Sequence, residues 1–208
     1  MEMLIAVGLM LGAYILGGIP FCYILGRLSA GEDVRKVGDH NVGAWNLLFN
    51  VNKIAGIFGA ILDVGKGALA YYIGLKFSAY DLTAYLCAVA SVFGHNWSPF
   101  IRFTGGKGIA TTLGGFIAAN YFSPLVFGII AMSLLLTVKS MVIGILGAIV
   151  GTLAFLIVFN RDVNTVIYAV LLLVVMAPKF IIESRDLRAK QGGTDRQPVR
   201  DLFSAKPR

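Results

Sequence analysis

The sequence has little charge. Asp, Glu, Lys and Arg together make up 14% of its 208 residues, whereas 57% of the residues are hydrophobic. Because soluble domains carry about 25% charged residues, this composition excludes an ordinary water-soluble domain. It indicates a membrane protein that crosses the bilayer several times.

Cysteine is almost absent. Cys22 and Cys87 both lie inside apolar segments, and their separation is unlike the short spacing of a metal site. We therefore expect two reduced packing residues and no metal centre.

The N-terminal segment lacks the features of a cleaved signal peptide. Residues 1–28 stay apolar for too long, begin with the acidic Glu2 and have no basic stretch before the apolar run. We expect this segment to remain in the protein as a membrane anchor.

Apolar segments recur along the rest of the chain. The full set is Leu4–Leu28, Ile54–Leu75, Leu82–Trp97, Thr112–Phe122, Leu125–Val138, Met141–Phe159 and Thr165–Ile182. The fourth and fifth are shorter than the ~20 residues that a full span needs. They are therefore either two short spans or one long helix broken at Ser123-Pro124, which gives a total of seven or six spans.

The distribution of Lys and Arg distinguishes the two topologies. With seven spans, fifteen basic residues fall on one side and two on the other, when Lys66 inside a span is not counted. With six spans the counts are ten and seven. Since basic residues concentrate on the cytoplasmic side, we predict an all-α membrane protein with seven transmembrane helices, some of them short. Its N-terminus is outside, residues 1–182 form one membrane-embedded domain, and residues 183–208 form a basic cytoplasmic tail.

The segment Thr104–Thr111, TGGKGIAT, here called the glycine loop, places a lysine among glycines where a polar loop meets an apolar helix. Glycine N–H groups can point into one concavity, the helix N-terminus adds positive potential, and Lys107 adds a mobile charge. A nucleotide P-loop would need glycine at position 101 and Ser or Thr after the lysine, but the chain has Ile101 and Gly108. The pattern favours a seat for a phosphate or acyl phosphate, with a structural glycine turn as the alternative. His95, just upstream, either orients a ligand or hydrogen-bonds the loop backbone.

Asp63 and Lys66 lie inside the second apolar segment, in the sequence DVGKG. Their spacing of three puts both on one helix face, where they can pair and offset the cost of charge in hydrocarbon. Ionisable residues at membrane depth indicate a functional site, and a purely structural ion pair is the alternative.

The segment Gly31–Asn46, here called loop one, is rich in turn residues and amide donors. It supplies Asn41, Gly43, Asn46 and the cation Arg35. In the seven-span topology, loop one, the glycine loop and the turn between the fifth and sixth segments share the cytoplasmic face. A cytoplasmic phosphorylated substrate would reach all three, whereas the alternative is an ordinary solvated loop beside the membrane.

Four segments carry a family likeness: YILGGIPFCYILGR, GEDVR followed by GDHNVGAWN, DVGKG, and GHNWSPFIRFTGGKGIAT. Together they resemble the bacterial integral-membrane acyl-phosphate:glycerol-3-phosphate acyltransferases, over Tyr14 to about Phe159. The last segment is the most specific, because its order and length match the family's second motif throughout.

The resemblance implies a multi-pass enzyme of the bacterial inner membrane with its active face in the cytoplasm. Its reaction would move a fatty acyl group from acyl phosphate to glycerol 3-phosphate and form lysophosphatidic acid for phospholipid biosynthesis. An acyl phosphate is already activated, so direct attack needs neither a covalent enzyme intermediate nor a cofactor. Membrane lipid is the other expected partner, nucleic acid is not expected, and the oligomeric state stays open, a monomer included.

The candidate site residues fall into two groups. The expected catalytic residues are Lys107 and His95, and no metal ligand is expected. The expected phosphate-binding residues are Gly105, Gly106, Gly108, Asn41, Gly43, Asn46, Arg35, Lys66 and Asp63.

The likeness is incomplete in two places. Asp39, Trp45 and Phe49 stand where the family's first motif has Ser, Thr and Arg, and residues 177–187 lack the His and Asn of its third motif. Two functions are therefore open. One is an acyltransferase, and the other is a catalytically weakened or inactive scaffold that binds phosphorylated lipid precursors or a partner in the membrane.

Overall fold

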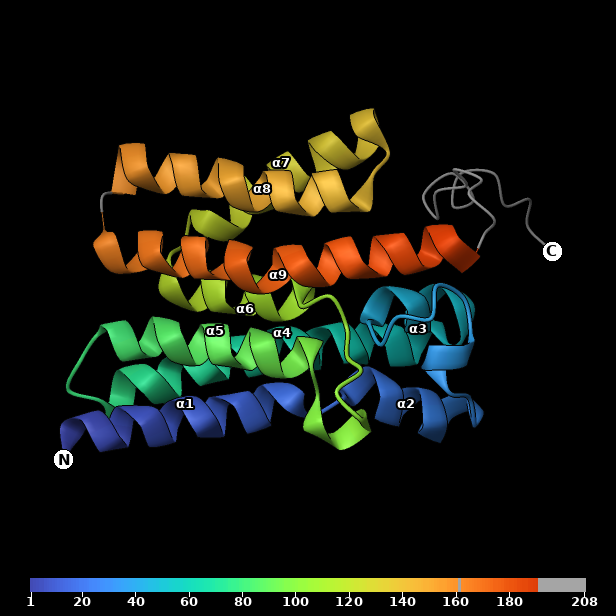
Figure 1. Cartoon of the computed structure of the whole chain (residues 1–208), viewed down its shortest axis with the longest axis horizontal. Coiled ribbons are helices and arrows are strands. Elements are labelled where there is room, and N and C mark those ends of the chain that lie inside the picture. Colours follow the sequence, from blue (N-terminus) through green and yellow to red (C-terminus); the bar gives the residue numbers. More distant parts are fainter. Residues whose placement is uncertain (161, 191–208) are drawn as a thin grey trace.

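The structure is a computed structural model that describes residues 1–160 and 162–190, and in this part of the chain every regular element is helical (Figure 1). The longer helices are α1 (Glu2–Gly18), α2 (Phe21–Ala30), α3 (Ala44–Asn50), α4 (Lys53–Phe77), α5 (Leu82–Asn96), α6 (Ile109–Ala119), α7 (Ser123–Val138), α8 (Met141–Phe155) and α9 (Val163–Lys190). Short helical turns are η1 (Val34–Lys36), η2 (Pro99–Ile101) and η3 (Leu156–Asn160). α9 continues past the predicted domain boundary at residue 182, and the rest of the predicted tail, with Arg161, lies outside the described residues.

The helices lie side by side with roughly parallel axes, and the chain runs back and forth between the two ends of the bundle (Figure 1). α1 packs against α5, α4 packs against α5 and α6, and α9 packs against α5 and α8. α7 packs mainly on α8. Loop one, the glycine loop and the α7–α8 turn all lie at the end of the bundle opposite the N-terminus, where α2 and α3 also lie (Figure 1).

Four helical segments are long and apolar enough to cross a membrane: Glu2–Ala30, Lys53–Phe77, Met141–Phe159 and Val163–Ile182. The helices α6 and α7 are apolar but shorter. They are separated by a turn in which the Asn120 side-chain oxygen accepts hydrogen bonds from the backbone N–H groups of Phe122 (2.9 Å) and Ser123 (3.2 Å). One long helix broken at Ser123-Pro124 is therefore wrong, while the seven-span count and the orientation of the termini stay predictions.

The first apolar segment is interrupted between α1 and α2. Pro20 has no N–H group to continue the helical ladder, so α1 ends at Gly18 and α2 begins at Phe21. The carbonyl of Ile19, inside this interruption, accepts a hydrogen bond from Lys66 Nζ of α4 at 3.1 Å. A segment predicted as one continuous span thus supplies a polar backbone group to the bundle interior.

Glycines bring α1 and α5 into direct backbone contact. A Cβ atom on Gly17 would lie 2.0 Å from the Ser91 carbonyl oxygen, and a Cβ atom on Gly94 would lie 2.1 Å from that of Tyr14. Since no larger side chain fits there, this contact fixes how closely α5 approaches the break at the end of α1.

Two pairs of glycines at GxxxG spacing differ in what they face. A Cβ atom on Gly147 or Gly151 of α8 would meet side chains of α7, so these glycines allow the two helices to pack closely. Around Gly8 and Gly12 of α1, a Cβ atom would meet nothing within 4 Å, so these two glycines make no close helix contact within the described residues.

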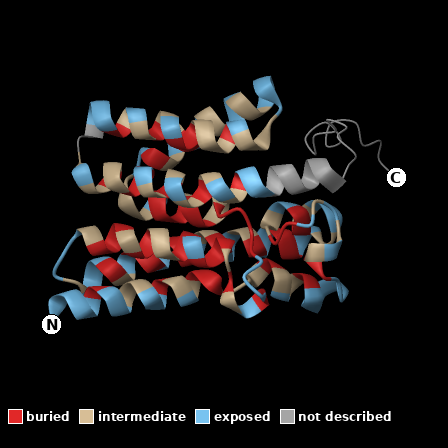
Figure 2. Cartoon of the chain, in the orientation of Figure 1, coloured by how far each residue is buried: buried red, intermediate tan, exposed pale blue. Residues whose placement is uncertain are grey.

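The largest buried cluster joins α5, α6, α8 and α9 (Figure 2). Its fully buried large side chains include Tyr168, Phe116, Leu172, Met176 and Phe180. Many large apolar side chains on the outer faces of α1, α7 and α8 are exposed, as expected for surfaces in contact with lipid tails. The bundle therefore has a buried apolar core and an apolar exterior.

Candidate active site

Asp63, Lys66 and His95 form one buried polar cluster between α4 and α5. Lys66 Nζ lies 2.7 Å from Asp63 Oδ1 and 2.9 Å from His95 Nδ1. The three residues are only 1%, 3% and 8% exposed. The predicted Asp63–Lys66 ion pair is therefore confirmed, and α5 adds a third member to it.

Lys66 has three polar partners. Besides Asp63 and His95, it donates to the Ile19 carbonyl at 3.1 Å. Because a charged amine only donates, His95 Nδ1 accepts here, which assigns the ring proton to Nε2. The Cys22 thiol donates to the second Asp63 oxygen at 3.3 Å. Such burial is tolerable because each charge is paired, and removal of one partner would leave an uncompensated charge.

The glycine loop packs on the C-terminal end of α5. The Gly106 N–H donates to the His95 carbonyl at 3.1 Å. A Cβ atom on Gly105 would lie 2.0 Å from that carbonyl oxygen, and one on Gly106 would lie 2.2 Å from His95 Nε2. Gly108 adopts a left-handed φ of 78° immediately before α6 begins at Ile109. The glycines thus let the loop lie against His95 and lead directly into a helix N-terminus.

The Lys107 side chain connects three parts of the molecule. Its Nζ atom lies 3.8 Å from Asp39 Oδ2 in loop one and 3.7 Å from Met141 Sδ at the start of α8. Lys107 itself is only 9% exposed. Loop one, the glycine loop and the α7–α8 turn are therefore joined by side-chain contacts as well as by their position in the bundle.

A small pocket lies where these elements meet. Asp63, Lys66 and His95 line it together with Gly105, Gly106 and Pro20. One wall is charged and another is glycine backbone. Such a lining suits a small anionic group better than a large apolar one.

Loop one is held in shape by the side chain of Asn46. Its amide nitrogen lies within hydrogen-bonding distance of the carbonyls of Val34 (2.8 Å), Val37 (2.9 Å) and Asn41 (3.0 Å). Its Oδ1 atom accepts from Asn50 at 2.9 Å. With two N–H protons shared among three carbonyls, Asn46 has no donor left for a phosphate, so in this structure it shapes the loop.

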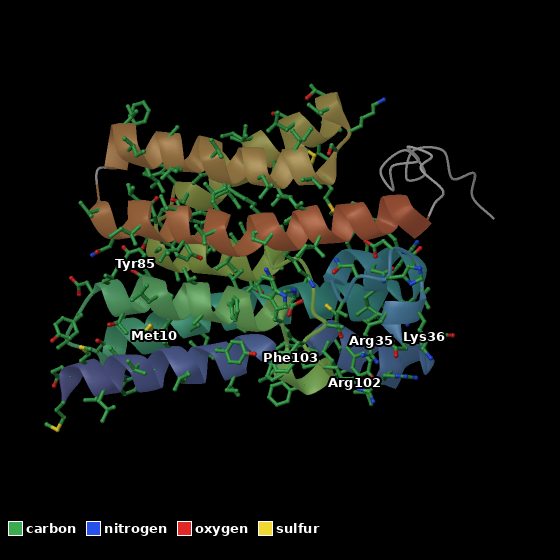
Figure 3. All side chains as sticks on the ribbon, in the orientation of Figure 1. Met10, Arg35, Lys36, Tyr85, Arg102 and Phe103 are labelled. Atoms are coloured by element: carbon green, nitrogen blue, oxygen red, sulfur yellow. The ribbon has the colours of Figure 1, made fainter. Side chains whose placement is uncertain are left out.

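The remaining loop-one candidates lie outside the lining of the pocket. Arg35 forms a double hydrogen bond with Asp33, from Nε at 2.9 Å and from Nη2 at 2.8 Å. These bonds from Arg35 lower the pKa of Asp33 to about 2, and they raise the pKa of Arg35. A Cβ atom on Gly43 would lie 2.9 Å from Asn41 Nδ2, so Asn41 folds over the glycine. Figure 3 shows Arg35 at the same end of the bundle as Arg102.

Three buried polar side chains near the glycine loop have atoms without a hydrogen-bond partner among the described residues. They are Asn41 at Oδ1, Asn96 at both amide atoms and Thr111 at Oγ1. Asn96 Oδ1 would lie 2.5 Å from a Cβ atom on Gly108. Buried polar groups normally have partners, so these atoms indicate where a ligand or water would complete the bonding. Sequence reasoning missed Asn96 and Thr111, although both lie within the GHNWSPFIRFTGGKGIAT segment.

Both cysteines are free and buried, which confirms two reduced packing residues. The contact between Cys22 and Asp63 was not predicted, because the two lie 41 positions apart in the chain. Across residues 1–160 and 162–190, no group of three or more His, Cys, Asp or Glu side chains is placed to hold a metal ion.

Comparison with known proteins connects this geometry to one family. A family model described as glycerol-3-phosphate acyltransferase matches residues 7–189. The chain belongs to this family. The glycerol-3-phosphate acyltransferase of Anaplasma phagocytophilum is 39% identical over 155 residues, which cover 73% of this chain and 78% of the relative. That of Wolbachia pipientis wMel is 38% identical over 151 residues, which cover 72% and 78%.

The family fold has also been solved. The crystal structure of PlsY (YgiH), an integral membrane glycerol 3-phosphate acyltransferase, in its glycerol 3-phosphate form superposes with a TM-score of 0.76 and 28% identity. The match covers 95% of this chain and 98% of PlsY. The lysophosphatidic acid form gives a TM-score of 0.75. The family resemblance and the integral-membrane fold are therefore confirmed over nearly the whole chain.

Proposed function

We propose that the protein transfers a fatty acyl group from an acyl phosphate to glycerol 3-phosphate and so forms lysophosphatidic acid. The observation that carries this proposal is the pocket in which glycine backbone meets the buried Asp63–Lys66–His95 cluster, with Lys107 nearby. The relative PlsY is known in a glycerol 3-phosphate form and a lysophosphatidic acid form, which supports the same acceptor and product for this chain.

The chemistry is direct acyl transfer. A hydroxyl oxygen of glycerol 3-phosphate attacks the carbonyl carbon of the acyl phosphate, and the bond from that carbon to the phosphate oxygen breaks. Phosphate leaves with the bonding electrons and takes up the hydroxyl proton. Because the donor is already activated, no covalent enzyme nucleophile takes part. The protein contributes by positioning two anionic reactants and offsetting their repulsion.

The glycine loop and Lys107 would hold one phosphate. The N-terminus of α6 provides unpaired N–H groups, and Lys107 is the nearby cation. The buried amide of Asn96 and hydroxyl of Thr111 are candidates to complete the shell. Loop one, with Arg35 and Asn41, would face the second phosphate.

The Asp63–Lys66–His95 cluster would hold the glycine loop in place. Lys66 forms a hydrogen bond with His95 Nδ1, and the other ring nitrogen, Nε2, lies next to Gly106. Since Asp63 neutralises Lys66, the cluster adds little net charge to the pocket. Its contribution would be a fixed position for the loop that binds phosphate.

The membrane arrangement belongs to the same proposal. Seven spans would place the N-terminus outside and the C-terminus in the cytoplasm, with residues 1–182 as one domain in the bacterial inner membrane. The position of loop one, the glycine loop and the α7–α8 turn at one end of the bundle supports a single cytoplasmic active face (Figure 1). Cysteine accessibility labelling of loop one and of the α4–α5 connection would test it, because the two must label from opposite sides.

The enzymatic proposal is tested by acyl transfer in a purified preparation, with a relative such as PlsY assayed alongside. We expect lysophosphatidic acid from acyl phosphate and glycerol 3-phosphate, and a loss of about 100-fold in rate for Lys107→Ala. Saturable acyl phosphate binding without turnover would instead support the inactive scaffold. Absence of both binding and turnover, while the relative works, would rule out both functions.

A further inference from the structure

Asp39 places a carboxylate beside the lysine of the glycine loop. Its Oδ2 atom lies 3.8 Å from Lys107 Nζ. The two side chains are only 13% and 10% exposed, so water screens the pair weakly. A partly buried anion is therefore already present where a phosphate would come to bind.

The position of Asp39 is set by its turn. The residues on either side, Gly38 and His40, both have a left-handed φ of 60°. The other carboxylate oxygen, Oδ1, accepts a hydrogen bond from the Asn41 backbone N–H at 3.3 Å. His40 Nδ1 in turn lies 3.0 Å from the Arg35 carbonyl oxygen. The turn thus directs Oδ2 at Lys107 by local geometry.

The contact between Asp39 and Lys107 is longer than a strong charge-assisted hydrogen bond, which spans about 2.7–2.9 Å. A phosphate carries up to about two negative charges at neutral pH and three acceptor oxygens, so it can bind Lys107 more closely than Asp39 does. The carboxylate and the phosphate would then compete for one cation and repel each other.

We propose that Asp39 sets the affinity of the phosphate seat: its carboxylate occupies Lys107 in the empty protein, and an incoming phosphate must displace it. The inference rests on the proposed function, since it assigns the glycine loop to the glycerol 3-phosphate acceptor. Asp39 lowers the affinity for any phosphate and so keeps weakly binding anions out of the seat. The affinity for the acceptor glycerol 3-phosphate is lower as a result.

The test measures glycerol 3-phosphate binding by isothermal titration calorimetry on the full chain in detergent. Asp39→Asn keeps the shape and removes the charge, and we expect it to bind glycerol 3-phosphate about tenfold more tightly. Asp39→Ser, a second neutral variant, should also bind more tightly. The matched control is Glu32→Gln, which removes a negative charge from an exposed position of the same loop and should leave the affinity unchanged.

A double variant isolates the pair. If Asp39 acts mainly through Lys107, adding Asp39→Asn to Lys107→Gln should give a much smaller gain in affinity than Asp39→Asn gives in the wild type, since only the direct repulsion is then removed. A full tenfold gain in the absence of Lys107 would contradict the proposal. So would unchanged or weaker binding in both Asp39 variants when their melting temperatures match the wild type.

Kinetics separate this role from a catalytic one and from failure of the proposed function. Tighter acceptor binding predicts a lower KM with kcat retained, whereas a loss of kcat at constant KM would make Asp39 a base and overturn the proposal. If the wild type forms no lysophosphatidic acid but Asp39→Asn still tightens binding, the acyltransferase function fails and the role of Asp39 stands. If the wild type turns over and Asp39→Asn binds no better, only the role of Asp39 fails.

Discussion

The two ends of the helix bundle each hold a carboxylate inside the protein, but its partners differ. At the pocket end, Asp63 is paired with the cation Lys66 and lies 3.5 Å from His95. At the other end, the half-buried Asp162 accepts from the Tyr85 hydroxyl at 3.0 Å and from Thr165, whose backbone N–H lies at 3.1 Å. Figure 3 labels Tyr85 at this far end, away from Arg102 and Phe103.

The difference distinguishes a carboxylate that stabilises helix packing from one that lies beside the candidate site. Burial raises the pKa of Asp162, but the hydrogen bonds from Thr165 and Tyr85 outweigh it and lower that pKa overall. Neutral donors thus satisfy this carboxylate locally, and it joins the start of α9 to α5. The cluster around Asp63 instead adjoins glycine backbone and lines a pocket. A carboxylate inside the bundle therefore does not by itself indicate a site, whereas the pocket and glycine backbone beside Asp63 support one there.

The largest effect is expected from breaking the charged cluster. Asp63→Asn leaves Lys66 buried without its counter-ion, which should cost about 3–5 kcal/mol of unfolding free energy. Titration with SDS in mixed micelles measures the loss. The double variant Asp63→Asn/Lys66→Met removes both charges and should recover most of it, while acyl transfer stays low. Wild-type stability in Asp63→Asn alone would show that the pair carries no structural role.

The next effect tests the contact between the cluster and the glycine loop. In Gly106→Ala the new methyl group would lie 2.2 Å from His95 Nε2, and His95 cannot yield easily because Lys66 holds its other nitrogen. We expect a shifted loop and a rate about 100-fold lower. Steady-state acyl-transfer kinetics measure the change.

The matched control for Gly106→Ala is Gly8→Ala in α1. No atom lies within 4 Å of the added carbon there, so activity should be unchanged. Stability should rise by about 0.5–1 kcal/mol, because alanine is a better helix former than glycine. Equal losses of activity in both variants would mean that the loop contact is not the cause.

A smaller effect is expected at the far end of the bundle. Tyr85→Phe removes one of the donors to Asp162 and should cost about 1–2 kcal/mol of stability. Acyl transfer at a permissive temperature should be unaffected, because this end only supports the helices. Tyr72→Phe, on the exposed face of α4, is the control and should change neither quantity. A loss of activity in Tyr85→Phe that Tyr72→Phe does not share would mean that the far end of the bundle also takes part in acyl transfer.

The smallest effect concerns the acid sensitivity of loop one. Arg35 lowers the pKa of Asp33 from 3.8 to about 2 in the folded protein, so the ionised form of Asp33 stabilises the fold above about pH 4. That contribution, about 1 kcal/mol after solvent screening of the guanidinium, disappears as the pH falls from about 4 to about 2. Melting temperatures of the wild type and Asp33→Asn should therefore converge over this window. A difference in melting temperature that stays constant over this window would mean that Asp33 does not stabilise the fold through its ionised contact with Arg35.

Much of this fold was predictable because membrane insertion depends on simple sequence properties. Apolar length and the placement of Lys and Arg located the helical segments and separated α6 from α7, and the spacing of Asp63 and Lys66 predicted their pairing. The contact at the Pro20 break was not predicted, because a proline in an apolar run does not reveal which side chain the neighbouring Ile19 carbonyl will bind. The contacts of Lys66 with His95 and Ile19 depend on how three helices pack.

The site was less predictable where distant segments meet. The glycine loop was recognised from local sequence, because glycine backbone and a helix N-terminus are local features. Asn46 was predicted as a phosphate ligand from its amide, but that amide is used by the backbone of its own loop. The pairing of Asp39 with Lys107 joins residues 68 positions apart and follows only from the fold.

The lining of the pocket has a consequence for biosynthesis. Every residue that lines it lies between Gly18 and Gly106, before α6 begins. The walls of the pocket are therefore translated before α7, α8 and α9 exist, since chains emerge from the ribosome N-terminus first. The later helices complete the membrane-facing bundle around it, and one of them, α8, brings Met141 to Lys107.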